Sequence, residues 1–299
     1  MQAVGFAALG FFCFTLMDIS IKWSLQSYSL LQVTFFNCLF ALLALLIWVY
    51  PRFNLLKTRH PLLHLLRAAI VLIADLLAFY SFGEVPLAEA YTLILTMPLF
   101  TAIFAFAFQQ EQLKPATVLL TLVGFVGVYF TLNPSFGSLQ IALLAALGCA
   151  AIESVGFLLV GRYRAQESPQ SFAVYGLSLV VLSTGLYTLF HYQPMTLAST
   201  AISLGGGICY ALATALVVSA FHIGSPTAVS SMQYTQLIWG MLLSFFIWHE
   251  LPSTNALWGG LLVSTAGLGL LYTQRPSSKS APTQQPLPDA RPSVPESVN

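Results

Sequence analysis

Hydrophobic residues occur in long runs that short polar segments separate. A helix that spans a bilayer needs about 20 mostly apolar residues, and the chain contains ten runs near that length. They cover residues 3–25, 30–50, 64–82, 88–108, 115–132, 139–160, 171–190, 198–221, 227–248 and 254–272. The connections are short and rich in Pro and Gly, so they leave no room for a soluble domain. The pattern predicts an all-α integral membrane protein with ten transmembrane helices.

The composition supports this interpretation and excludes several classes of function. Of the 299 residues, 57% are hydrophobic and 7% are charged, whereas soluble domains carry about 25% charged residues. The net charge of +1 gives no basic surface for nucleic acid. The four cysteines lie inside apolar runs, so we expect small core residues instead of disulfides. The first run lacks a preceding basic segment and contains Asp18, so we do not expect a signal peptide.

Basic residues predict the orientation of the helices. With a cytoplasmic N-terminus, ten of the eleven Lys and Arg residues fall on the cytoplasmic side, and only Lys22 falls toward the outside. Cytoplasmic loops carry such an excess of Lys and Arg. An even number of helices then places both termini in the cytoplasm. Residues 274–299 contain many prolines and serines, and this composition predicts a disordered cytoplasmic tail.

An internal repeat divides the chain into two halves. The segment 7–10 (AALG) recurs at 145–148, Gln32 matches Gln170, and Glu111 matches Glu250, at offsets of 138 or 139 positions. The predicted repeats are residues 3–133 and 139–273, with five helices each. Because five is odd, the second copy enters the membrane inverted, which is a recurrent design of secondary transporters. Gene duplication in a membrane protein without a transport role is the alternative.

Ionisable side chains inside the apolar runs are candidate ligands for a substrate or an ion, because such groups usually face a bundle interior. Asp18 and Lys22 are four residues apart, so we expect them to pair on one helix face. Glu153 falls close to the repeat position of Asp18. Asp75 lies midway along the third helix, and Tyr210 lies in the repeat-related eighth helix. Hydrogen bonding between helices is the structural alternative for these groups.

The fourth and ninth predicted helices share a polar pattern, and Pro98 is expected to kink the fourth. The complete set of candidate ligands for a substrate or a coupling ion is Asp18, Lys22, Asp75, Tyr91, Thr96, Glu153, Tyr210, Gln233 and Tyr234. Glu111, Glu250 and Pro98 are interpreted as helix-end or gating elements. No P-loop, HExxH or GxSxG motif occurs in the chain, so we expect no cofactor, no metal and no catalytic residues.

Several of these segments resemble the EamA type of the drug/metabolite transporter superfamily. The resemblance covers about residues 3–273 and is carried by MDISIKW at 17–23, LRAAIVLIADLLAFYSF at 66–82 and the segment 86–111, with its echo at 226–250. It implies a bundle around a central cavity, with the fifth and tenth helices packed outside it. Segments 17–23 and 88–98 are most similar to members that handle S-adenosylmethionine or riboflavin. Asn37 departs from those members, which often have Arg there.

These observations favour a secondary transporter of a small organic metabolite, by alternating access, in a bacterial inner membrane. The resemblance implies an amino acid, a nucleoside-like compound, S-adenosylmethionine or riboflavin as substrate. A coupled proton or cation, and a monomer or homodimer, are compatible with the pattern. A membrane-embedded enzyme, a lipid-handling protein and a structural membrane subunit are the alternatives from other classes.

Overall fold

The protein is a bundle of helices in the part of the chain that the structure describes. The structure is a computed structural model and describes residues 2–109, 115–132, 141–163, 166–224 and 226–273. In these residues, nine helical stretches are long and apolar enough to cross a membrane. The prediction of an all-helical membrane protein is confirmed. The ten-helix inverted repeat, with its domain boundaries, stays a prediction.

The helices follow the predicted hydrophobic runs closely. Their bounds are α1 Gln2–Leu25, α2 Leu30–Val49, η1 Tyr50–Leu56, α3 Pro61–Glu84, α4 Leu87–Ile94, α5 Met97–Gln109, α6 Pro115–Leu132, α7 Ile141–Tyr163, α8 Pro169–His191, α9 Leu197–Ile223, α10 Pro226–Ser231, η2 Met232–Tyr234, α11 Thr235–Trp248 and α12 Thr254–Thr273. The predicted tail at 274–299 lies outside the described residues.

Two of the predicted runs are broken in the middle. The run 88–108 becomes α4 and α5, separated at Leu95 and Thr96. Pro98 explains this break, because a proline ring clashes with the carbonyl four residues earlier, and that residue is Ile94, the last of α4. The predicted kink is therefore confirmed. The run 227–248 is divided between α10, the 3-10 turn η2 and α11, although it has no proline near the break.

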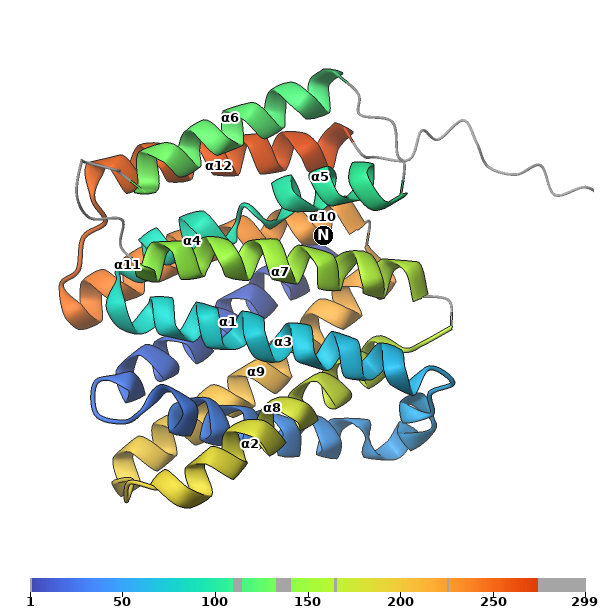
Figure 1. Cartoon of the computed structure of the whole chain (residues 1–299), viewed down its shortest axis with the longest axis vertical. Helices are drawn as coiled ribbons and strands as arrows, with labels where there is room; N and C mark the ends of the chain where they lie inside the picture. The colour runs from blue at the N-terminus through green and yellow to red at the C-terminus, as the bar shows by residue number, and fades with distance from the viewer. Residues whose placement is uncertain (1, 110–114, 133–140, 164–165, 225, 274–299) are drawn as a thin grey trace, which may run out of the picture.

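The helices pack in pairs that join the two halves of the chain (Figure 1). Helix α1 packs along α9, and α3 packs on α7 and α8. Helix α2 contacts α8 and α9, whereas α4 packs against α11. Helices α6 and α12 pack on each other at one side of the bundle. The other helices lie between the α6–α12 pair on one side and the α2–α8 pair on the other, and they form the interior of the molecule.

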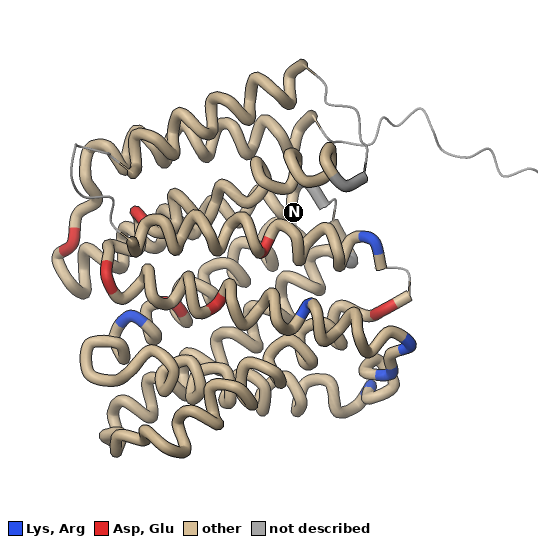
Figure 2. The backbone as a smooth tube through the Cα atoms, in the orientation of Figure 1, with Lys and Arg blue, Asp and Glu red and all other residues tan. Residues whose placement is uncertain are grey.

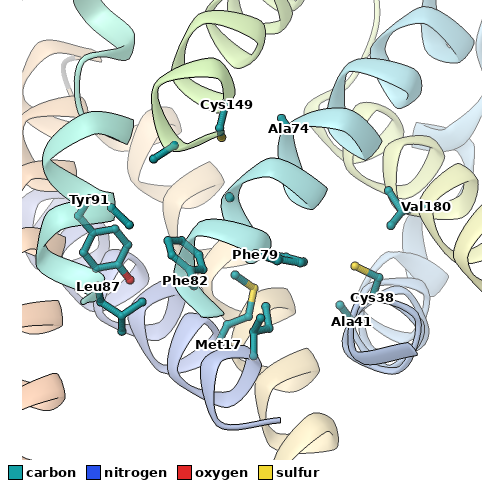
Figure 3. Packing of buried hydrophobic residues seen from close by; sticks show 14 of the residues in the cluster. Met17, Cys38, Ala41, Ala74, Phe79, Phe82, Leu87, Tyr91, Cys149 and Val180 are labelled. Carbon is teal, nitrogen blue, oxygen red and sulfur yellow. The ribbon is translucent and has the colours of Figure 1, made fainter. Parts of the chain in front are cut away.

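Buried side chains fill the contacts between these helices. Figure 3 shows Cys38 and Ala41 of α2 on the side of Val180 of α8, and Met17 of α1 beside Phe79 of α3. Phe79, Cys38 and Val180 are all buried. The cysteines at 13, 38, 149 and 209 are free thiols inside helices, in agreement with the interpretation that they are small core residues.

Charged residues separate toward the two ends of the bundle (Figure 2). We call the end that carries the α2–α3 connection and the start of α8 the basic end, and the end that carries the α3–α4 and α11–α12 connections the acidic end. The described Lys and Arg residues at or toward the basic end are Arg52, Lys57, Arg59, Arg67 and Arg162. The acidic end holds Glu84, Glu89 and Glu250, together with Lys22. This separation agrees with the charge asymmetry of the sequence.

Glu167 ties two connections together at the basic end. Its Oε1 accepts hydrogen bonds from the Thr58 hydroxyl (2.9 Å) and the Arg59 amide (3.1 Å). Its Oε2 lies 3.1 Å from Nε2 of His64, and only 1% of the Glu167 side chain is exposed. Burial by itself raises the pKa of Glu167, but the hydrogen bonds with His64, Thr58 and Arg59 outweigh it and leave the pKa below its ordinary value.

The lowered pKa predicts a pH-dependent contribution of Glu167 to stability. A carboxyl whose pKa falls on folding stabilises the fold above its unfolded pKa of about 4.3, and this stabilisation is lost as the pH falls through the folded pKa. Glu167→Gln should therefore destabilise the protein at neutral pH, and the difference from wild type should shrink in acid. Thermal unfolding in lipid nanodiscs across this pH range checks the prediction. The exposed Glu84→Gln is the matched control, and a difference that stays constant with pH would contradict the expectation.

Three consecutive glycines in α9 offer a test of the α2–α9 contact. A Cβ on Gly207 would lie 2.6 Å from the Ala41 backbone nitrogen and 2.6 Å from the Phe40 Cβ of α2, whereas a Cβ on Gly205 would meet nothing within 4 Å. Backbone atoms cannot move aside as a side-chain tip can. Gly207→Ala should destabilise the fold by about 1–3 kcal/mol, and Gly205→Ala should be neutral or slightly stabilising. Equal unfolding midpoints for the two variants would show that the helices are not in this close contact.

Candidate functional site

A cavity of about 340 Å³ lies in the interior of the bundle. Residues from α1, α3, α4, α7, α9, α10, η2 and α11 contribute to its walls. Six of the nine predicted ligands line it, namely Asp18, Asp75, Tyr91, Glu153, Tyr210 and Gln233. Residues that are far apart in the sequence thus meet around one space, which makes this cavity the candidate binding site.

Asp18 and Tyr91 form a buried hydrogen bond at the cavity wall. The Tyr91 hydroxyl donates to Oδ2 of Asp18 over 2.6 Å, and Asp18 is 5% exposed. Phe82 packs edge-on against the Tyr91 ring with centroids 5.7 Å apart, as the neighbouring labels in Figure 3 show. Gly240 of α11 leaves room for the same ring, because a Cβ there would collide with it. The position of Tyr91 is therefore fixed from two sides.

Glu153 is paired with Arg67 of α3. Nη1 and Nη2 of Arg67 donate to the two carboxylate oxygens over 3.2 and 2.6 Å. Such a bidentate pair fixes the geometry of both groups. Gly156 lies three residues after Glu153 on α7, and a Cβ there would come within 3.0 Å of Arg67 Nη1. The glycine thus makes room for the guanidinium beside the carboxylate.

Asp75 lies between these two sites on α3. Its Oδ2 is buried and has no hydrogen-bond partner among the described atoms. Asp75 follows Arg67 by eight residues, which places the two about 80° apart around the helix and within one broad face. The Arg67 guanidinium nevertheless bonds to Glu153. The cavity therefore has one carboxylate with a hydroxyl donor, one with a guanidinium, and one with an unpartnered oxygen.

Aromatic rings form much of the remaining wall. Phe14 and Tyr210 meet edge to face with centroids 5.6 Å apart, and Phe79, Phe82 and Phe157 also line the cavity. Rings of this kind offer flat apolar surfaces with a negative face. Gln233 and Gln236 add amide groups from the broken α10–η2–α11 segment. The site can therefore hold a solute that has both a flat apolar part and polar groups.

The expected pairing of Asp18 with Lys22 is wrong. Lys22 donates to Glu250 Oε2 over 2.6 Å and to the Val85 carbonyl over 2.9 Å. One turn of helix, about 6 Å, separates Lys22 from Asp18 toward the acidic end. His249 has a left-handed backbone (φ 55°), and this C-terminal turn directs the chain after α11 back toward α1. Lys22 lies outside the cavity lining and forms an ion pair between the cavity and the acidic end.

Thr96 and Tyr234 are also absent from the cavity lining. The Thr96 hydroxyl donates to the Leu93 carbonyl over 2.6 Å at the α4–α5 break. The Tyr234 hydroxyl lies 3.4 Å from the Leu95 carbonyl. Both hydroxyls contact carbonyls at the α4–α5 break, where the Thr96 amide also donates to the Leu93 carbonyl over 3.1 Å. Pro98 lines a separate depression of about 120 Å³ together with Gln233, and Glu111 lies outside the described residues.

Arg67 is the residue that sequence reasoning missed. Its position near the start of α3 places it close to the basic connection, and we counted it there among residues that set the orientation. Its spacing of eight from Asp75 is the signal that would have indicated a shared inward face. The Phe79, Phe82 and Phe157 rings carry no comparable signal, because aromatic residues are common on every face of membrane helices.

Comparisons with known proteins agree with this architecture. Residues 1–133 match the EamA-like transporter family. A Rickettsia bellii protein named S-adenosylmethionine uptake transporter is 26% identical over 82% of this chain and 84% of its own length. A Pseudomonas aeruginosa pseudopaline exporter is 24% identical over 90% and 95% of the two chains. A riboflavin transporter of Vibrio cholerae is 26% identical over 75% and 76%.

A solved crystal structure shows the same fold. It superposes with a TM-score of 0.63 and covers 91% of this chain and 98% of its own chain, at 18% sequence identity. At this identity the match concerns the fold alone.

The Arg67–Glu153 pair should show strong energetic coupling. Removing one partner leaves the other charge unpaired in a largely buried place, since the side chains are 12% and 21% exposed. Arg67→Met should lower the free energy of unfolding by about 1–3 kcal/mol, less than for a fully buried pair. Adding Glu153→Gln should recover part of that loss. Denaturant unfolding of both single variants and the double variant checks this, and additive effects would contradict a direct pair.

Proposed function

We propose that this chain, whose residues 1–133 match the EamA-like transporter family, moves a small organic metabolite across the membrane by alternating access around the central cavity. The observation that carries the proposal is the convergence of Asp18, Asp75 and Glu153 on one cavity inside a membrane bundle. Ionisable groups at this depth are costly, and they commonly mark a substrate or ion pathway. The relatives are named as transporters, and we propose transport without chemical change of the solute.

An inverted repeat would supply the two states. Its support is a packing pattern that repeats when the halves are exchanged. Exchanging the halves replaces α1 by α7, α2 by α8, α3 by α9 and α6 by α12. The contact of α1 with α9 then becomes that of α7 with α3, and the contact of α2 with α9 becomes that of α8 with α3. The α2–α8 and α6–α12 contacts are unchanged by the exchange. The breaks after Ile94 and around η2 also correspond at an offset of 139. The Tyr234 hydroxyl approaches the Leu95 carbonyl, which places the two breaks against each other, as expected beside a two-fold axis.

The Lys22–Glu250 pair would act as a gate. It joins α1 to the chain after α11, and Lys22 also holds the Val85 carbonyl between α3 and α4. These contacts close the acidic end beyond the cavity. If water replaced these contacts of Lys22, α1 and α11 would separate at this end, while the basic end closes. Glu250 thus acts as a gating element and not as a substrate ligand.

The basic end would face the cytoplasm, since cytoplasmic connections carry an excess of Lys and Arg. Both termini would then be cytoplasmic. The curated relatives named above are bacterial, which supports a bacterial inner membrane. The bundle would work as a monomer or homodimer, and a proton or cation bound at the cavity carboxylates would couple to substrate movement.

The substrate class would be among those of the relatives. S-adenosylmethionine and riboflavin are two of the substrates that their names give, and an amino acid or nucleoside-like compound would use similar contacts. All of them combine a polar group with rings or apolar parts that suit the aromatic wall. Metabolite profiling of cells with and without the chain, inside and outside, identifies the transported compound.

Flux measurements then test the site. In proteoliposomes, Glu153→Gln and Asp18→Asn should each lower the rate of uptake or counterflow of that compound at least about tenfold, because each alters a cavity carboxylate. Glu84→Gln changes an exposed carboxylate at the end of α3 and should transport as wild type does. Wild-type rates and affinities in both cavity variants, at equal amounts of folded protein, would refute the assignment of the site.

A further inference from the structure

We propose that the cavity selects an organic cation with a flat ring, and that Asp75 is the counter-ion of its positive charge. This inference rests on the proposed transport function and deepens it by assigning the charge of the solute. It is carried by the balance of charged groups around the cavity, by the unpartnered oxygen of Asp75, and by the aromatic wall.

The charged groups of the cavity do not balance. Three carboxylates, those of Asp18, Asp75 and Glu153, line it, and its described lining contains no Lys, Arg or His. Arg67 is the basic residue next to it, and two of its nitrogens are engaged by the two oxygens of Glu153. A carboxylate or phosphate on a solute would therefore meet no free cation here. It would instead meet two further carboxylates, so the cavity disfavours anions.

The two remaining carboxylates differ in what they accept. Asp18 takes a hydrogen bond from the neutral Tyr91 hydroxyl. The buried Oδ2 of Asp75 takes none from the described residues. An ionised oxygen that is withdrawn from water without a partner is costly, and a positive group on the solute removes that cost. Asp75 is thus the carboxylate with an acceptor left to offer.

The surrounding rings suit the rest of such a solute. Phe14, Phe82 and Tyr210 lie in the same cavity lining as Asp75, and the faces of aromatic rings attract cations within about 6 Å. A volume of about 340 Å³ is at the small end of the usual range for ligand pockets. A solute of one or two fused rings with a positive group fits this space, and its flat part would pack against the rings.

Binding of small probes to the purified protein in lipid nanodiscs tests this charge preference directly. The probes are N-methylquinolinium, which is a fixed planar cation, quinoline at a pH where it is neutral, and naphthoate, which is an anion of similar shape. Empty nanodiscs give the contribution of the lipid. Wild-type protein should bind the cation at least about tenfold more tightly than either other probe, a factor that corresponds to about 1.4 kcal/mol.

Variants then assign the counter-ion. Asp75→Asn keeps the size of the side chain but removes its charge, and it should lose at least about tenfold in affinity for N-methylquinolinium while its weak binding of quinoline stays unchanged. Glu84→Gln removes one carboxylate nine residues later on the same helix, at an exposed position, and should bind the cation as wild type does. Thermal unfolding of both variants verifies that they are folded. The comparison of the three probes on wild-type protein needs no variant.

The outcomes separate this inference from the transport proposal. Equal affinity for the three probes, tighter binding of the neutral or anionic probe, or unchanged cation binding by folded Asp75→Asn would each overturn the inference. If no probe binds but the profiled metabolite is still transported, the assigned charge class is wrong and transport stands. If neither binding nor metabolite flux is found, the proposed function itself fails.

Discussion

Charge must be compensated inside this bundle, and the rest of the site depends on how that is done. Water is scarce at the depth of the cavity, so each ionisable side chain needs a partner on a neighbouring helix. Glu153 obtains Arg67 from α3, and Lys22 obtains Glu250 from the chain after α11. Asp75 keeps one oxygen without a partner in the described structure. The two ion pairs link helices, whereas the uncompensated carboxylate gives the cavity its chemical character.

The two interrupted helices provide the polar backbone and side chains of the centre. Carbonyl groups at a break lose their usual partner four residues later, so shorter backbone hydrogen bonds or side chains must satisfy them. The Thr96 and Tyr234 hydroxyls point to the Leu93 and Leu95 carbonyls at the first break. This explains why these two residues, although correctly placed near the centre, stabilise the backbone and do not line the cavity. Tyr91, on the intact turn before the break, reaches Asp18 instead.

Helical periodicity predicted which residues face inward more reliably than it predicted their partners. The spacing of four residues predicted that Asp18 and Lys22 are neighbours on one helix, and both do lie in α1 one turn apart. Lys22 nevertheless has Glu250 within 2.6 Å, because the turn at His249 brings a residue from 228 positions away to the same place. The spacing along one helix contains no information about this competing partner from another segment. Arg67 was missed for the same reason, since its partner Glu153 lies on α7.

The sequence by itself determined the helices, because about 20 apolar residues in a row have few stable alternatives in a bilayer. It also determined the break at Pro98, through the missing amide and the clash of its ring, and it identified six of the residues that line the cavity. The tertiary structure decided which charges pair, where η2 interrupts the helix, and which polar residues are turned to the cavity instead of the backbone. The two ion pairs join residues 86 and 228 positions apart, and local spacing does not encode the distance between helices.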